Sequence, residues 1–171
     1  VEVPSVDEVD QGDPVDVARV NAEHKAAAVS VHRREDEVLV AVDTLVACGS
    51  TIFGKPRNED DARRMLLELR SASHVVVGGM AVIDLENRMH VLHATTHVRF
   101  RSFPGSLLDD YLASGEWRGR AGGYAIQGRG AAMGASIDGD YLNVVGMPVA
   151  ALHDLLEQLK IDAHRMARSG G

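Results

Sequence analysis

The sequence is poor in the residues and segments that mark several classes of protein. It has one cysteine, Cys48, which excludes an internal disulfide framework and a zinc site made of several cysteines. Aromatic residues make up only 4% of the chain, so few rings are available for stacking on single-stranded nucleic acid. No apolar stretch approaches the roughly 18 residues of a membrane-spanning helix, and no signal-peptide pattern opens the chain. We therefore expect a cytoplasmic protein that does not enter a membrane.

The chain also lacks an excess of positive charge, since its formal net charge is −7. An acidic protein has no general field that attracts DNA or an anionic membrane, but a few cations and a divalent metal focused in one cleft can still bind a nucleotide. With 171 residues, 45% hydrophobic and 25% charged, the composition is that of a globular protein. We expect one domain over residues 1–171, with a frayed tail at 163–171.

Helical and strand patterns alternate along the chain, which predicts an α/β fold. Asp13 and Pro14 are typical of a helix start, as N-cap and first helical residue. Val38–Val42 is a continuous apolar run and predicts a buried strand. Further strands are expected at Thr51–Pro56, His74–Asp84 and Met89–Arg101, and further helices after Asn58, over Pro104–Ala113 and over Val149–Lys160.

Asp43 and Thr44 follow the apolar run directly, which we expect to place them at the end of that strand. A carboxylate at the carboxyl end of a strand stands where open α/β sheets bind ligands. There Asp43 could hold a divalent metal or accept a proton from water. The alternative is an acid that caps a turn together with Thr44, and the local pattern leaves both open.

Two lysines are candidates for phosphate binding. Lys55 is held between Gly54 and Pro56 after a short strand, which suits a fixed point charge. Lys25 lies within the first predicted helix. For both lysines the alternative is an ordinary solvated side chain.

The segment Ala121–Gly130 is rich in glycine, which permits close approach of the backbone to a ligand. Within it Gln127 offers a paired donor and acceptor, as recognition of a base edge requires. The segment does not match a Walker phosphate loop, and a flexible loop or a bulged strand is the alternative. Nearer the middle of the chain, we expect His74 to begin a strand and to border the cleft.

Taken together, several segments resemble the Maf family of nucleotide pyrophosphatases. They occur in the family's order and span nearly the whole chain: Val6–Glu8, Ala22–Ala26, Val42–Thr44, Gly54–Pro56, Ser73–Val76, Arg120–Gly128 and Ile137–Pro148.

The resemblance implies an α/β domain with a long mixed sheet and a cleft between two lobes. It implies hydrolysis of a nucleoside triphosphate between its α and β phosphates, with Mg²⁺ or Mn²⁺ as cofactor. By position, Asp43 matches the family's proton acceptor, and Glu8 with Asp43 matches the metal-binding acids. Lys25 and Lys55 match the lysines that meet the phosphates.

The same resemblance assigns substrate contacts to Thr44, Gln127 and Arg120, with Thr44 and Gln127 at positions linked to base choice. It favours the subgroup that acts on dTTP and UTP. It further implies a homodimer, a role in clearing unwanted nucleotides and a link to arrest of cell division.

Four departures from the family pattern bear on activity, one of which, Arg120 where lysine is usual, preserves the charge. The family's Ser-x-Ser-Pro-Arg-Arg segment has no match here, so either the sequence is truncated or a phosphate-binding element is lost. Ser73 and Gly78 stand where threonine is common, and Gly78 removes a hydroxyl. Two alternatives therefore stay open beside the enzyme: a nucleotide-binding regulatory protein with little turnover, and a structural partner in cell division.

Overall fold

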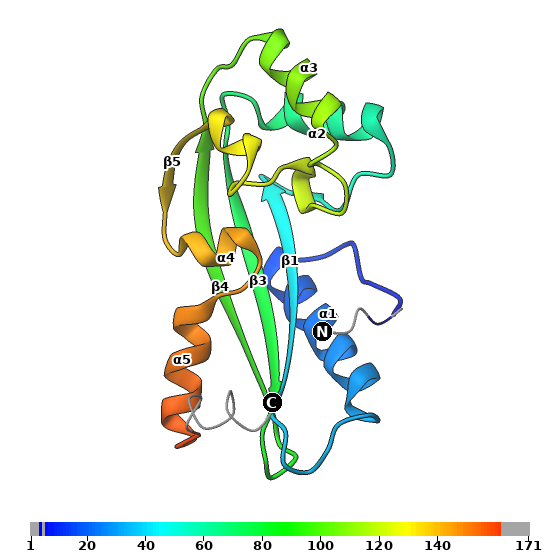
Figure 1. Cartoon of the computed structure of the whole chain (residues 1–171), viewed down its shortest axis with the longest axis vertical. Coiled ribbons are helices and arrows are strands. Elements are labelled where there is room, and N and C mark those ends of the chain that lie inside the picture. The colour runs from blue at the N-terminus through cyan, green and yellow to red at the C-terminus, as the bar shows by residue number, and fades with distance from the viewer. Residues whose placement is uncertain (1–3, 5, 162–171) are drawn as a thin grey trace.

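A single five-stranded sheet runs through the computed structural model, which describes residue 4 and residues 6–161 (Figure 1). The expected tail at 163–171 lies outside the described residues. The strand order is β2-β1-β3-β4-β5. The strands are β1 (Leu39–Cys48), β2 (Thr51–Phe53), β3 (Ser73–Ile83), β4 (Met89–Phe100) and β5 (Gly134–Asp138).

All four pairs of neighbouring strands in this sheet are antiparallel. The α/β class is confirmed, but the expectation of a mixed sheet is wrong for the described strands. Short connections account for two of the four pairs, because a tight turn at Gly49 returns β1 into β2, and residues 84–88 return β3 into β4. Short connections of this kind join antiparallel strands, whereas parallel strands need a long crossover.

Strand β1 continues well past the point where its apolar run ends. Asp43 and Thr44 lie in its middle, paired across the sheet with Gly79 and Gly78 of β3. The expectation that Asp43 ends a strand is therefore wrong, and so is the alternative of a turn cap. A buried acid is tolerated within a strand because partners from another element satisfy it, as described below.

The helices begin where the sequence supplies caps. In α1 (Pro14–Ser30) the Asp13 carboxylate accepts the backbone N–H of Val15 at 2.9 Å, and in α2 (Glu59–Leu69) Asn58 accepts that of Asp61 at 2.8 Å. These contacts satisfy donors that a helix start leaves free. The other helices are α3 (Gly105–Ser114), α4 (Tyr141–Val145) and α5 (Val149–Gln158), with 3₁₀ turns η1 (Ala121–Gly123) and η2 (Arg129–Met133).

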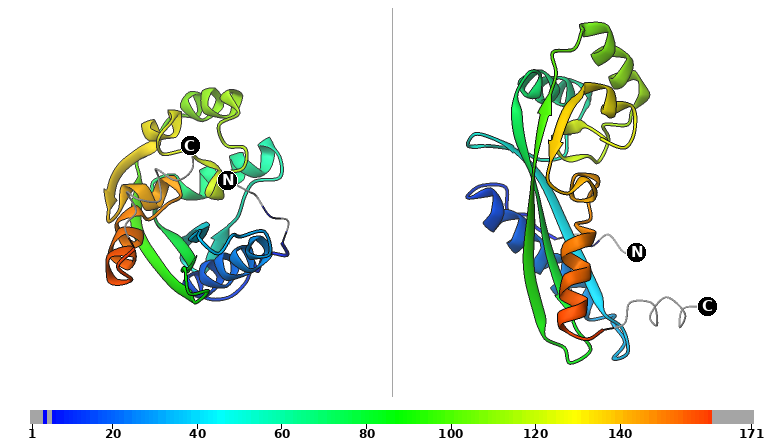
Figure 2. Two further views of the ribbon diagram at one scale, coloured as in Figure 1. Left: turned by 60° about the horizontal axis from the view of Figure 1, so that its bottom comes forward. Right: turned by 90° about the vertical axis from the view of Figure 1, so that its left-hand side faces the viewer.

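Helices α1 and α5 cover opposite faces of the long strands (Figure 2). Odd-numbered residues of β1 and β3, such as Ala41 and Ala81, pack against α1, while even-numbered ones, such as Met80 and Val82, pack against α5. This period of two is the geometry of an extended strand. It follows that Asp43 and Thr44, as neighbours in β1, face opposite sides of the sheet.

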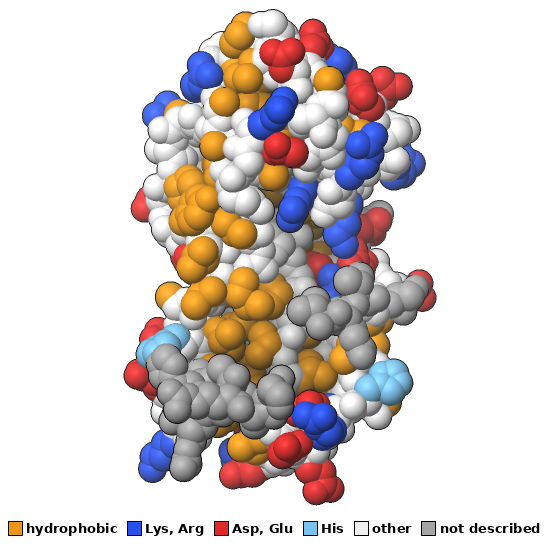
Figure 3. Space-filling view, viewed as in Figure 1, with side chains coloured by type: hydrophobic (Ala, Val, Ile, Leu, Met, Phe, Trp, Pro, Cys, Tyr) orange, Lys and Arg blue, Asp and Glu red, His pale blue; other side chains and the backbone are white. Residues whose placement is uncertain are grey.

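A second, larger core lies at the other end of the sheet. It joins the ends of the strands to α2, α3 and the two 3₁₀ turns, around Phe100, Tyr111 and Leu66. We call this end the upper lobe, and the end that holds α1 and α5 the lower lobe. The space-filling view shows the molecule drawn in at mid-height between the two lobes (Figure 3). Among the described residues no helix is both long and apolar enough to span a bilayer.

Candidate active site

The ammonium group of Lys25 links two carboxylates that come from distant parts of the chain. It donates a short hydrogen bond to Asp43 Oδ1 on β1 and lies 2.8 Å from Glu8 Oε1 on the segment before α1. The Lys25 side chain is only 14% exposed, and that of Asp43 is 8% exposed. Lys25 is therefore not the solvated helical lysine that its surroundings in the sequence allowed.

Helix α1 can reach Asp43 because it lies unusually close to the sheet. A Cβ atom on Gly79, the cross-strand partner of Asp43, would stand 2.1 Å from the carbonyl oxygen of Ala18. Helix α1 also turns a fully buried stripe of alanines toward the strands, at Ala18, Ala22 and Ala26. With a glycine and alanines at the contact, the backbones approach closely, and Lys25 on the same helix can contact Asp43.

Asn21 holds Asp43 and the backbone next to Glu8 in place, although it was not among the residues predicted from the sequence. Its side-chain amide donates to Asp43 Oδ2 at 3.2 Å and to the backbone oxygen of Val9 at 2.9 Å. Its Oδ1 accepts the backbone N–H of Val9 at 2.7 Å. The Asn21 side chain thus fixes both Asp43 and the backbone next to Glu8. Its spacing could have identified it, because Asn21 lies four residues before Lys25 and therefore on the same face of a helix that is otherwise rich in alanine.

Lys55 approaches the cluster from the upper lobe. Its ammonium nitrogen lies 3.5 Å from Glu8 Oε1, and its side chain is 54% exposed. The loop that carries it is tied to the glycine-rich segment, since the backbone N–H of Gly122 donates to the carbonyl of Gly54 at 3.1 Å. The structure therefore brings together four of the predicted residues, from four separate segments: Glu8, Lys25, Asp43 and Lys55.

These contacts favour the charged forms of the cluster. The hydrogen bond from Lys25 lowers the pKa of Glu8, an effect that the charge of Lys55 reinforces and partial burial opposes. Burial by itself would lower the pKa of Lys25, but the hydrogen bonds to Asp43 and Glu8 outweigh it and raise the pKa. The contact between Glu8 and Lys25 thus favours the charged form of both side chains.

The other three predicted residues make no described contact with this cluster. Thr44 faces the opposite side of the sheet, where its hydroxyl lies near Gly146 after α4. Gln127 is exposed in the connection between η1 and η2, and Arg120 is exposed just before η1. Substrate contacts for these three stay a prediction.

Comparison with known proteins places these residues in a family. The model of the family described as "Maf-like protein" matches residues 1–159. Proteins named dTTP/UTP pyrophosphatase are similar over most of the chain. That of Dictyoglomus thermophilum is 38% identical over 160 residues, covering 91% of this chain and 82% of the relative. That of Pelotomaculum thermopropionicum is 40% identical over 156 residues, covering 90% and 81%. That of Pyrococcus furiosus is 37% identical over 151 residues, covering 88% and 78%. The chain belongs to the Maf family.

In this Maf-family chain, the carboxylates of Glu8 and Asp43 are oxygen ligands of the kind that a hard divalent cation prefers. Among the described residues there is no group of three or more His, Cys, Asp and Glu side chains that could hold a metal ion. Glu8 and Asp43 nevertheless bring carboxylate oxygens to one cation, the Lys25 ammonium. Mg²⁺ is commonly bound by one or two carboxylates together with substrate phosphates, so the two acids fit that role.

His74 is a core residue of the Maf-family chain rather than a residue of the cleft border. It is 2% exposed, its ring contacts Phe100 edge-on, and its Nε2 is 2.9 Å from the hydroxyl of Tyr124. Burial lowers the pKa of His74 to about 4. The neutral ring therefore belongs to the packing of the upper lobe.

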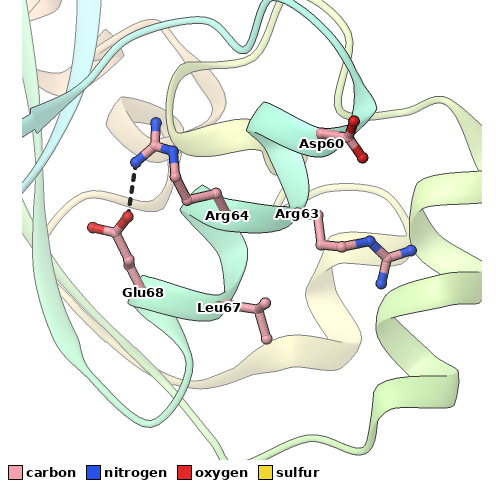
Figure 4. A pocket seen from close by; sticks show the side chains of 5 residues that line it. All are labelled: Asp60, Arg63, Arg64, Leu67 and Glu68. Carbon is pink, nitrogen blue, oxygen red and sulfur yellow. Dashed lines mark hydrogen bonds and ion pairs between the residues drawn. The ribbon is translucent and has the colours of Figure 1, made fainter.

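A separate open hollow lies on the surface of α2 (Figure 4). Its charged side chains are largely paired: Arg64 with Glu68 at 2.7 Å, and Arg63 with Asp109 of α3 at 2.6 Å. Leu67 provides its only apolar side chain. None of the predicted site residues lines this hollow, so the chemistry is expected at the Lys25 cluster.

Proposed function

We propose that the protein hydrolyses nucleoside triphosphates to the monophosphate and pyrophosphate, with dTTP and UTP as preferred substrates. The cluster of Lys25 and Lys55 with the carboxylates of Asp43 and Glu8 is the observation that carries the proposal. The names of three similar proteins supply the substrates. Phosphoanhydride hydrolysis asks a protein mainly for charge neutralisation and for a well-placed water, and this cluster offers two ammonium groups for the first and a carboxylate that could orient a water for the second.

The two lysines would bind the phosphates. Lys55 is more than half exposed and points its ammonium at the cluster from the upper lobe, so a phosphate can reach it without displacing packed groups. Lys25 is held by carboxylates and can exchange them for phosphate oxygens, which are anionic acceptors of the same kind.

Asp43 would accept the proton of the attacking water. The water oxygen forms a bond to the α-phosphorus, the bond from that phosphorus to the bridging oxygen breaks, and pyrophosphate leaves with the bonding electrons. Once Lys25 contacts phosphate, Asp43 Oδ1 is free to take the proton, while Oδ2 stays bound to Asn21. A carboxylate held on one oxygen and open on the other suits a general base.

Glu8 and Asp43 would also hold a divalent metal, Mg²⁺ or Mn²⁺, with a second lone pair of Asp43 Oδ1 left for the water. Such an ion polarises phosphoryl oxygens and offsets the negative charge of the triphosphate. Base choice is assigned to Gln127 and Thr44, with Arg120 as a further substrate contact. Cytoplasmic location, a homodimer, clearance of unwanted nucleotides and a link to cell division complete the proposal, and these rest on the family resemblance.

The test is pyrophosphate release by an Asp43→Asn variant. The amide keeps the shape of the side chain but cannot accept the proton, so we expect the rate to fall by about 100-fold or more while the fold persists. Asp154→Asn is the matched control, because Asp154 is exposed on α5 and should leave the rate unchanged. An Asp43→Asn variant with near-normal turnover would remove Asp43 from the mechanism.

A further inference from the structure

The Lys25 ammonium sits where two acids converge. It contacts Asp43 Oδ1 and lies 2.8 Å from Glu8 Oε1, while Lys55 approaches Glu8 Oε1 at 3.5 Å. The Lys25 side chain is mostly shielded from solvent. Two carboxylates and two ammonium groups thus balance in charge within one cluster.

The same two carboxylates are the acids that a divalent metal would use. An ammonium group and a metal ion cannot both occupy the position between these oxygens, because Mg²⁺ needs oxygen ligands at about 2.0–2.1 Å and Lys25 fills that space. Without another anion, a metal that displaced Lys25 would stand beside two uncompensated ammonium groups. Without a nucleotide, metal binding is therefore opposed both by repulsion from the two ammonium groups and by the presence of Lys25 in the site.

We infer that Lys25 takes the place of the divalent metal between Glu8 and Asp43 in the free protein, so that the metal binds only together with a nucleotide. The phosphates bring the missing negative charge and accept the Lys25 ammonium, which frees both carboxylates. Asn21 remains on Asp43 Oδ2 and on the Val9 backbone during this exchange, so the acids keep their positions. This inference rests on the proposed function for the identity of the nucleotide.

The first arm of the test measures Mn²⁺ binding by calorimetry, without nucleotide, for the full-length protein and for Lys25→Met. Removal of the competing ammonium should tighten Mn²⁺ binding by at least about tenfold, the scale on which neighbouring groups change metal affinity. Lys160→Met is the matched control, since Lys160 is exposed in the turn after α5 and its replacement should not change the affinity. Equal Mn²⁺ affinity in Lys25→Met and the unmodified protein would overturn the inference.

Adding Glu8→Gln to Lys25→Met should abolish the gained affinity, which locates the metal at the carboxylates. Should Lys25→Met fail to fold by circular dichroism, Lys25→Gln takes its place. The unmodified protein alone is also decisive, because tight Mn²⁺ binding at micromolar concentration without nucleotide contradicts the inference.

The second arm adds α,β-methylene-dUTP, which cannot be cleaved between the α and β phosphates. We expect Mn²⁺ affinity of the unmodified protein to rise at least about tenfold in its presence, and no rise would overturn the coupling. Pyrophosphate release is measured separately. If the protein hydrolyses nucleotides but binds Mn²⁺ tightly without one, this inference alone is wrong. If it hydrolyses no nucleotide at all, the proposed function is wrong.

Discussion

The side chain of Asn143 fills the space that a side chain at Gly78 would need. A Cβ atom on Gly78 would stand 2.1 Å from Asn143 Oδ1. Asn143 is fully buried, and its amide donates to Val76 O at 3.1 Å, to Ala94 O at 3.3 Å and to Thr96 Oγ1 at 3.1 Å. The glycine that departs from the family pattern thus belongs to the contact that seats α4 on β3 and β4.

Gly78→Ala should therefore destabilise the protein. Asn143 must move and loses hydrogen bonds, and overpacking of this kind costs roughly 1–3 kcal/mol. Urea unfolding measures the loss of free energy. Gly105→Ala is the matched control, since its Cβ meets nothing within 4 Å. If both variants unfold at the same urea concentration, the contact does not constrain residue 78.

Asn21→Ala should lower turnover more than stability. The change leaves the Val9 N–H and one Asp43 oxygen without their partner, for a cost of about 1–3 kcal/mol in stability. Because Asn21 positions Asp43 and the Glu8 segment, we expect kcat to fall with little change in KM. Steady-state kinetics well below the melting temperature measure both.

Asn58→Ala provides the comparison for Asn21→Ala. It removes the cap of α2 and should cost about 1 kcal/mol of stability without changing kcat. Equal kcat in the two variants would make Asn21 a purely structural residue.

Gln127→Ala should change the preference among bases rather than the overall rate. Gln127 is exposed, so its loss should not disturb packing, and a contact to the base edge would be lost. The measurement is the ratio of kcat/KM for dTTP, UTP, CTP and GTP, with exposed Gln158→Ala as control. A uniform decrease for all four nucleotides would remove Gln127 from base recognition.

His74 should make stability depend on pH below neutrality. Its pKa is about 4 in the folded protein against 6.5 unfolded, so below 6.5 the unfolded chain binds more protons. Stability then rises with pH through the window from 4 to 6.5 and is lost as pH falls through it, by roughly 3 kcal/mol in all. Urea unfolding across this window measures the slope.

His74→Gln should flatten that slope, whereas His153→Gln, at an exposed position of α5, should leave it unchanged. An unaltered slope in His74→Gln would mean that other groups cause the pH dependence.

Local chemistry made much of the fold predictable. Asp13 caps α1 and α2 begins directly after Asn58, both as predicted, since a helix start depends only on residues a few positions away. The position of Asp43 in the middle of β1 could not be predicted from its neighbours in the sequence. A charge within an apolar run looks like a strand end, and only the partners on α1 make its burial tolerable.

Four of the seven predicted site residues come together in the structure, and their roles in catalysis stay a prediction. Family resemblance identified Glu8, Lys25, Asp43 and Lys55, and these residues meet in the structure. Asn21 was missed because an amide in a helix carries no chemistry by itself. Thr44 lies on the other face of the sheet because side chains alternate along a strand, and this was missed because Asp43 and Thr44 were expected to end the strand.

The most direct test of the proposed activity is pyrophosphate release from a panel of nucleoside triphosphates by the full-length protein with Mg²⁺ or Mn²⁺. We predict selective release of pyrophosphate, and not of single phosphate, from dTTP and UTP. Folded protein that releases no pyrophosphate from any nucleotide in the presence of metal would contradict the proposed function.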